Sequence, residues 1–139
     1  MADIWATPRT TTAARPLSPH LSVYRPTLTM TMSIAHRITG AALYAGTMLL
    51  AWWLIAASDD AAAFARVAGV LNSWFGRLIL FGFSWALFHH MFGGLRHFIW
   101  DMGRGLEHPE REYLAAATLI GGLALTLLVW LIFFMTHRG

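Results

Sequence analysis

Three long runs of apolar residues dominate the chain, and short polar segments separate them. The runs cover roughly 38–57, 74–100 and 114–135, and the last contains no ionisable side chain. Because a helix needs roughly 20 apolar residues to cross the hydrocarbon core of a bilayer, each run is long enough for one crossing. Trp74 and Trp100 bound the second run, where aromatic residues are typical of the membrane interface. The pattern therefore predicts three transmembrane helices.

We expect the helices at about 30–57, 72–100 and 113–136, within one membrane domain that spans 30–139. Residues 1–29 are polar and proline-containing, and they lack the short apolar run and cleavage site of a signal peptide. We expect this segment on the cytoplasmic side. Its Ser, Thr and Arg content also resembles a mitochondrial transit peptide, but Asp3 and the short length favour a bacterial inner-membrane protein. The predicted fold class is all-α integral membrane.

Composition narrows the possible functions. The chain is 57% hydrophobic and only 12% charged over 139 residues, which excludes an ordinary soluble domain. It has no cysteine, and this excludes an iron–sulfur cluster, a covalently attached c-type haem and a disulfide. The polar segments are too short to enclose a soluble substrate. We expect any chemistry to take place in the membrane or at its surface, shared with partners.

Arginine alone reports the orientation, because the chain has no lysine and cytoplasmic loops retain positive charge. Seven arginines lie on one predicted side and three on the other, which puts the N-terminus and the 101–113 loop in the cytoplasm and the C-terminus in the periplasm. We interpret the net charge of +3 as topology and contact with membrane lipid, with no ordered basic surface for nucleic acid. The two groups are Arg9, Arg15, Arg25, Arg37, Arg96, Arg104 and Arg111 against Arg66, Arg77 and Arg138.

The segment HHMFGGLRHFIWD at 89–101 concentrates polar residues inside the second apolar run. Ionisable groups in a transmembrane helix usually face the bundle interior and are functional candidates. Six residues separate His90 from Arg96, which places His90 roughly 9 Å deeper in the membrane. Gly93 and Gly94 leave room beside His90 for a flat ligand or for a close neighbouring helix. Two interpretations remain open, namely interhelical hydrogen bonding and ligation of a metal or haem.

A second polar cluster opens the first helix. Ser33, His36 and Arg37 are spaced i, i+3 and i+4 and therefore share one helical face, which Gly40 and Tyr44 continue inward. A serine N-cap with an arginine snorkelling to the headgroups is one explanation. The other is a site for the acidic groups of a cofactor, which imidazole and guanidinium suit. The predicted topology places both clusters at the same membrane face, and this favours the cofactor.

Two extended motifs carry a family resemblance. The first runs from RPL at 15–17 through Leu21 and Leu28 to SIAHRITG at 33–40, and the second is HMFGGLRHFIWDMG at 90–103. With the three-helix layout, they make the chain similar to the cytochrome b subunits of succinate dehydrogenase, the larger of two small membrane anchors in respiratory complex II. The resemblance covers nearly the whole chain from Arg15 onward, and neither motif departs from the family pattern.

The resemblance implies roles for individual residues. His90 matches the axial ligand of haem b, His36 and Arg37 match residues that contact the haem propionates, and Ser33 and Arg37 match residues that contact ubiquinone. The second iron ligand comes from the other small anchor in this family, with the haem between the two subunits. Adjacent residues on a helix point about 100° apart, so His89 cannot bind the same iron. We assign structural or interface roles to His97 and Asp101.

The resemblance also implies the partners. A flavoprotein subunit oxidises succinate in the tricarboxylic acid cycle, and an iron–sulfur subunit passes the electrons to ubiquinone in the respiratory chain. This chain would anchor both and complete a helix bundle with the second small anchor, without oxidising succinate itself.

Three alternatives stay open. The first is the anchor of a fumarate reductase. The second is a self-contained b-type cytochrome, which lacks a second ligand at matching depth, because His36 lies too near the surface and His137 on the other side. The third is a structural anchor without haem.

Overall fold

The computed structural model describes residues 25–137, and this part of the chain is helical without strands. Its four helices are α1 (Leu28–Ser58), α2 (Ala61–Asn72), α3 (Trp74–Asp101) and α4 (Glu110–Thr136). Most of the expected N-terminal segment, with Arg9, Arg15 and the start of the first motif, lies outside the described residues. Arg138 lies outside them too, so the membrane side of Arg9, Arg15 and Arg138 stays a prediction.

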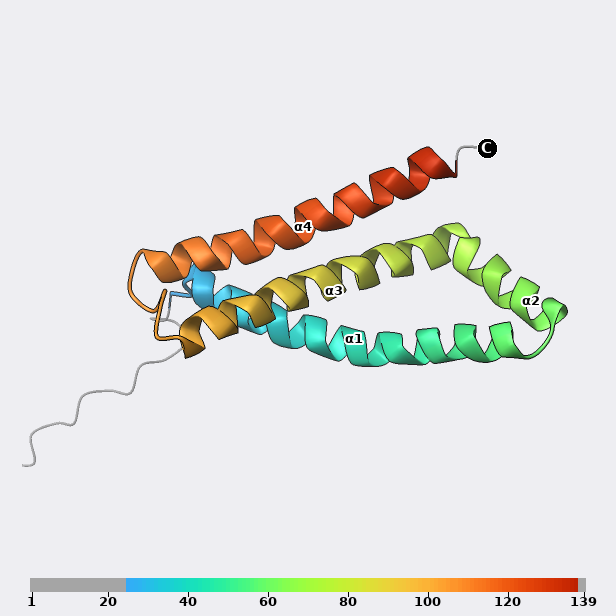
Figure 1. Cartoon of the computed structure of the whole chain (residues 1–139), viewed down its shortest axis with the longest axis horizontal. Helices are drawn as coiled ribbons and strands as arrows, with labels where there is room; N and C mark the ends of the chain where they lie inside the picture. Colours follow the sequence, from blue (N-terminus) through green and yellow to red (C-terminus); the bar gives the residue numbers. More distant parts are fainter. Residues whose placement is uncertain (1–24, 138–139) are drawn as a thin grey trace, which may run out of the picture.

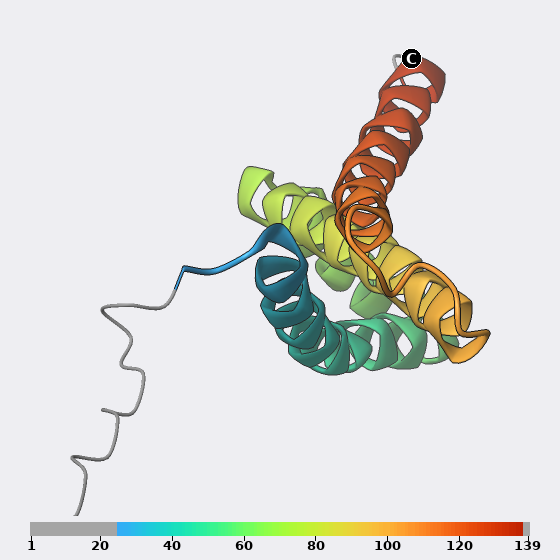
Figure 2. The ribbon, with the colours of Figure 1, turned by 90° about the vertical axis from the view of Figure 1, so that its left-hand side faces the viewer.

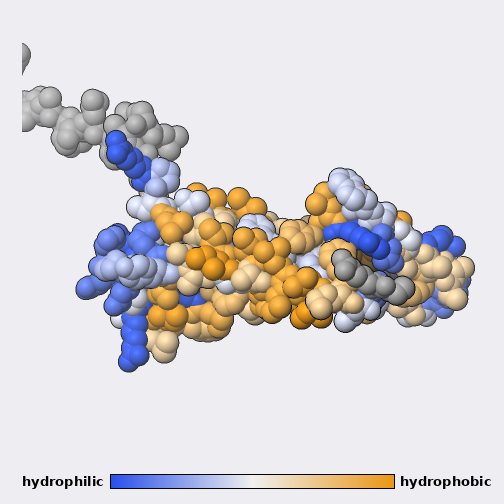
Figure 3. All heavy atoms as spheres, turned by 90° about the horizontal axis from the view of Figure 1, so that it is seen from above, coloured by the Kyte–Doolittle hydropathy of each residue, from blue (hydrophilic) through white to orange (hydrophobic). Residues whose placement is uncertain are grey.

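The helices α1, α3 and α4 are each long and apolar enough to cross a membrane. They contain 31, 28 and 27 residues, and at a rise of 1.5 Å per residue they extend over roughly 40–46 Å. Figure 3 shows apolar atoms over the middle of the molecule and hydrophilic atoms at both ends. The prediction of an all-α protein with three transmembrane helices is confirmed.

The helices run up and down, with α3 between the other two long helices (Figures 1 and 2). Helix α4 makes the most extensive contact with α3, and α1 packs against the other side of α3. The start of α1, the end of α3 and the start of α4 lie together (Figure 1). We call this the 102–109 end, after the loop that joins α3 to α4. The two motif clusters therefore lie toward one end, as the predicted topology requires.

Helix α2 was not predicted from the sequence, because we expected only a short loop between the first helix, ending at about 57, and the second, beginning at about 72. Ser73 instead ends one helix and begins the next, because its N–H bonds to the carbonyl of Gly69 at 3.2 Å and its Oγ accepts from the N–H of Gly76 at 3.1 Å. Asp60 caps the start of α2 by accepting from the N–H of Ala63 at 2.6 Å. An aspartate N-cap was a visible signal, but twelve residues are too few for a membrane span.

Small residues line the contact between α3 and α4. At Gly122 an added Cβ would lie 3.0 Å from the Cα of His89, so the two backbones touch there. Such contacts are typical of transmembrane helices, which gain little from burying apolar side chains away from lipid. Large apolar side chains accordingly point outward over most of the described surface. The buried residues of these two helices are Gly76, Ala86, His89, Gly93 and Arg96 on α3, and Ala115, Thr118, Gly122 and Thr126 on α4.

Candidate functional site

His90 faces α1 and is held by the backbone of that helix. Its Nδ1 lies 3.0 Å from the carbonyl oxygen of His36 and 3.5 Å from Oγ1 of Thr39. The carbonyl oxygen of His36 can only accept hydrogen bonds. The Thr39 hydroxyl also donates to it, at 2.9 Å. We infer from these partners that Nδ1 carries the proton. Nε2 then has a free lone pair, and no residue of 25–137 hydrogen bonds to it.

The imidazole of His36 stacks on that of His90, with ring centroids 3.9 Å apart and planes 8° from parallel. The ring of His97 lies 5.5 Å from His36 on the other side. Nδ1 of His36 is buried and has no hydrogen-bond partner within the described part of the chain. Three imidazoles from two helices thus meet at one place, and one of them has a buried nitrogen in need of a partner.

Gly93 and Gly94 of the second motif have different surroundings. An added Cβ at Gly93 would overlap the His36 ring, so the missing side chain allows α1 to approach α3. Gly94 has no atom within 4 Å of where its Cβ would lie, so it leaves open space one turn from His90. Close approach of the two helices therefore accounts for Gly93, whereas room for a ligand beside Gly94 stays a prediction.

Ser33 and Arg37 lie one turn apart on α1, at the same end as His36. Ser33 is half-buried and Arg37 is exposed. Neither forms a hydrogen bond or ion pair within residues 25–137. The structure thus joins His36 to His90 and leaves the donors of Ser33 and Arg37 unused. Tyr44, which was expected to continue this face, is 74% exposed.

His89 faces α4 and not α1, in agreement with the angle of about 100° between neighbouring helical residues. It is fully buried against Gly122 of α4, its ring lies 5.3 Å from that of Trp85, and neither ring nitrogen has a partner in the described chain. Arg96, two turns along the same stripe, is 2% exposed. Its Cζ lies 4.9 Å from the ring centroid of Trp100. We expected Arg96 near the loop surface. Its spacing of seven residues from His89, about two helical turns, indicates that the two side chains share one face, which we did not predict.

Hydrogen bonds fix the helices around the site at the 102–109 end. The Thr29 hydroxyl donates to Oε1 of Glu112 at 2.8 Å and so joins α1 to α4. The indole N–H of Trp100 donates to the carbonyl of Gly105 at 3.0 Å and holds the loop against α3. Gly105 has a φ of 69°, a conformation that favours glycine.

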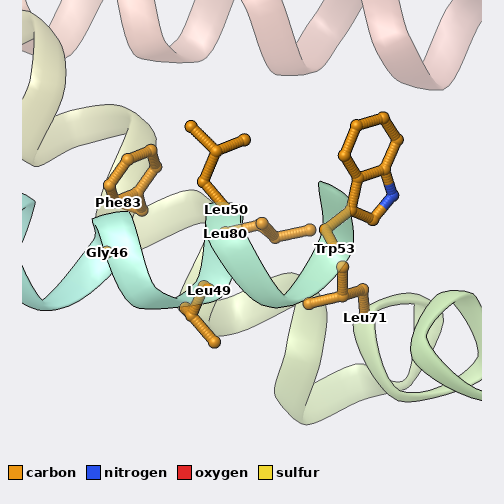
Figure 4. A pocket seen from close by; sticks show the side chains of 7 residues that line it. All are labelled: Gly46, Leu49, Leu50, Trp53, Leu71, Leu80 and Phe83. Carbon is orange, nitrogen blue, oxygen red and sulfur yellow. The ribbon is translucent and has the colours of Figure 1, made fainter. Parts of the chain in front are cut away.

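A groove of about 270 Å³ lies farther along the bundle, between α1, α2 and α3 (Figure 4). Its only polar side-chain group is the indole N–H of Trp53, so it offers neither an iron ligand nor a partner for a carboxylate. The candidate site is therefore the cluster around His90. The groove is lined by Gly46, Leu49, Leu50, Trp53, Leu71, Leu80 and Phe83.

Comparison with known proteins gives a consistent result. The family model described as "succinate dehydrogenase/fumarate reductase transmembrane subunit" matches residues 11–135. The succinate dehydrogenase cytochrome b556 subunit of Paracoccus denitrificans is 46% identical over 121 residues, covering 87% of this chain and 93% of that protein. The subunit of the same name from Rickettsia felis is 35% identical over 84% of this chain and 90% of its own length. The mitochondrial cytochrome b560 subunit of Sus scrofa is 36% identical over 76% of this chain and 64% of its own length. The chain therefore belongs to the succinate dehydrogenase/fumarate reductase transmembrane subunit family.

Proposed function

We propose that this chain is the membrane-anchor cytochrome b subunit of a succinate dehydrogenase, that it ligates haem b, and that it forms part of the ubiquinone-reducing site. The observation that carries the proposal is the state of His90, whose Nδ1 is hydrogen bonded to α1 while Nε2 is free. Names of the relatives support it, because they are succinate dehydrogenase cytochrome b subunits from bacteria and mitochondria.

The residues around His90 fit a haem. An axial histidine typically donates its other ring N–H to a carbonyl or carboxylate, which sets the tautomer and orients the ring. His90 has this arrangement toward the carbonyl of His36, at 3.0 Å. Haem b, when bound, supplies one-electron redox chemistry. Within residues 25–137, His36 and His97 belong to the same ring cluster as His90, and His89 faces α4. His108 lies in the loop between α3 and α4, and His137 lies at the opposite end, so the second ligand is assigned to the partner anchor subunit.

The haem propionates are assigned to His36 and Arg37. His36 has a buried Nδ1 without a partner beside His90, and Arg37 carries a guanidinium without an ion pair in the described chain. A guanidinium binds a carboxylate through two parallel hydrogen bonds, and imidazole adds a third donor. Both groups lie at the 102–109 end, where a propionate would leave the hydrocarbon core and reach polar surroundings.

The ubiquinone contacts are assigned to Ser33 and Arg37. A quinone carbonyl needs a hydrogen-bond donor, and the negative charge that develops as it accepts electrons is stabilised by a nearby fixed cation. The half-buried hydroxyl of Ser33 supplies the donor, and the exposed guanidinium of Arg37 supplies the cation. Their position at the end of the membrane span suits a site where electrons arrive from a soluble iron–sulfur subunit.

The whole enzyme requires partners. A flavoprotein subunit would oxidise succinate, an iron–sulfur subunit would carry the electrons, and a second small anchor would complete the helix bundle and the haem site. Outward-facing apolar side chains along α1 and α4 are available for that second anchor and for lipid. We place the protein in the bacterial cell membrane, with the 102–109 end cytoplasmic, because Arg37, Arg104 and Arg111 are exposed at that end.

The test is purification of the tagged chain from its native membranes in mild detergent. We expect a flavoprotein, an iron–sulfur protein and one further small membrane protein to co-purify, with a reduced-minus-oxidised spectrum of a b-type haem. The preparation should reduce a short-chain ubiquinone with succinate. A complex without b-type haem would leave only the structural-anchor alternative. Fumarate reduction with quinol at a rate well above succinate oxidation would instead favour the fumarate reductase alternative that the family description includes.

A further inference from the structure

Thr39 lies on the face of α1 that meets α3, and it is 2% exposed. Its Oγ1 is 3.5 Å from Nδ1 of His90, and its hydroxyl donates to the carbonyl of His36 at 2.9 Å. That carbonyl is the acceptor that lies 3.0 Å from the same Nδ1. The hydroxyl, the carbonyl and the imidazole N–H of three residues therefore meet at one point.

A carbonyl inside a helix usually accepts only from the N–H four residues later. A threonine hydroxyl that bonds back to the preceding turn bends the helix locally and tilts its carbonyl outward. Thr39 forms such a bond three residues back, to the very carbonyl that accepts from α3. Gly40 completes the arrangement, because an added Cβ there would lie only 3.0 Å from Cε1 of His90.

We propose that Thr39 is a positioning residue for the iron ligand. Its hydroxyl keeps the carbonyl of His36 turned toward α3 and places a second acceptor beside Nδ1 of His90. Together they hold the ring in one orientation and one tautomer, in which Nε2 retains its lone pair for iron. A ring rotated by half a turn would place a carbon against both oxygens and lose the hydrogen bond. This inference rests on the proposed function, because it requires haem on His90.

Other buried threonines provide the comparison for this role. Thr118 and Thr126 on α4 also donate to carbonyls of their own helix, at 2.8 and 2.7 Å, and they are 2% and 0% exposed. Neither has a histidine nitrogen within hydrogen-bond reach in the described structure. They share the helix-packing role of a buried threonine and lack the contact with the ligand, which makes Thr126→Val the matched control.

The experiment uses the whole purified complex with Thr39→Val, Thr39→Ser and Thr126→Val. The readouts are the low-field g value of the ferric haem by electron paramagnetic resonance, the haem midpoint potential and the rate of haem loss. In Thr39→Val we expect a shifted g value and a raised potential, because the ligand becomes less basic when its N–H loses an acceptor. Haem should dissociate about two- to tenfold faster, because this factor corresponds to the net free energy of one hydrogen bond. Thr39→Ser and Thr126→Val should match the wild type in all three.

A wild-type g value, potential and haem-loss rate in Thr39→Val would overturn the inference. An equal shift in Thr39→Ser would also overturn it, because the hydroxyl would not be the cause. Thr39→Ala is measured alongside with the same expectation as Thr39→Val, so that an unstable valine variant still leaves a decisive result. Failure of the proposed function looks different, since the wild-type complex would lack b-type haem or His90→Leu would keep it.

Discussion

The two sides of α3 differ in how they use polar residues. On the α1 side, Nδ1 of His90 lies 3.0 Å from the carbonyl oxygen of His36, and Nε2 is free. Gly94, one turn away, has open space where its Cβ would lie. On the α4 side, His89 is fully buried where Gly122 of α4 meets the α3 backbone, and Arg96, two turns along the same stripe, is 2% exposed. Both sides carry a histidine and a glycine contact, yet only one side leaves a ligating atom accessible.

Under the proposed function, burial alone does not identify the iron ligand. The more deeply buried histidine is His89, and its closed surroundings leave no room for a flat ligand. The candidate ligand is the partly buried His90, because its ring is oriented and its Nε2 is free. Four predictions test this contrast between the α1 side and the α4 side.

The largest effect is expected from His90→Leu. The variant should lose the b-type haem spectrum, because it removes the proposed iron ligand, whose Nδ1 is hydrogen bonded to α1 and whose Nε2 is free among residues 25–137. His89→Leu should keep the spectrum, because it replaces a side chain with two unpaired buried nitrogens by an apolar one of similar size. The measurement is haem per flavin in the assembled complex. Equal losses in the two variants would show that the sides are not functionally distinct.

Ser33→Ala and Arg37→Leu test whether the quinone contacts also belong to the α1 side. Succinate-to-quinone turnover should fall tenfold or more in at least one variant, since loss of one donor to a developing oxyanion costs about 2.7–4 kcal/mol in enzymes. Succinate oxidation by a soluble artificial acceptor should stay intact. Ser33→Ala is the cleaner variant, because Arg37 is also assigned to the propionates. Thr118→Ala, on the α4 side, is the control, and wild-type turnover in both test variants would place the quinone pocket elsewhere.

Alanine substitutions at Gly93 and Gly122 should distinguish effects on the haem site from effects on helix packing. In Gly93→Ala the added methyl group meets the movable His36 ring, so we expect a changed haem spectrum with little loss of assembly. In Gly122→Ala it meets the backbone of His89, so α4 must move and the complex should lose about 1–3 kcal/mol of stability. Gly82→Ala, on α3 and away from His90, also has open space at the added Cβ and is the matched control. Haem spectra and thermal stability in detergent give the comparison, and a reversed pattern would contradict it.

The smallest effect concerns the link between α1 and α4 at the 102–109 end. Thr29→Val removes the hydrogen bond to Glu112 and should lower stability by about 1 kcal/mol, without changing the haem spectrum. Thr31→Val is the control, because the Thr31 hydroxyl bonds only to the carbonyl of Thr27 in its own chain segment. Thermal unfolding of the two complexes provides the measurement. A spectral change in Thr29→Val would mean that this link shapes the haem site directly.

Several features could be predicted because they depend on distance along the chain. The length of each apolar run predicted the three spans, since a bilayer has a fixed thickness. Helical periodicity predicted that His89 and His90 face different ways. Two crossings separate the start of the first motif from the end of the second, and this predicted that both motifs lie at one end. Helix α2 escaped prediction because its twelve residues are too few for a membrane span, and the segment between the first two spans was expected to be a loop.

By itself the sequence determined the three spans, the polar clusters at one end and the divergence of the two adjacent histidines, because these follow from helical rise and rotation. Only the tertiary structure decided which neighbour each histidine meets. That choice depends on where helices can approach, and the missing side chains of Gly93 and Gly122 set those points of contact. The tautomer of His90 depends on one carbonyl of α1, 54 residues away along the chain. Such a contact exists only once the helices have packed, so no spacing in the sequence could reveal it.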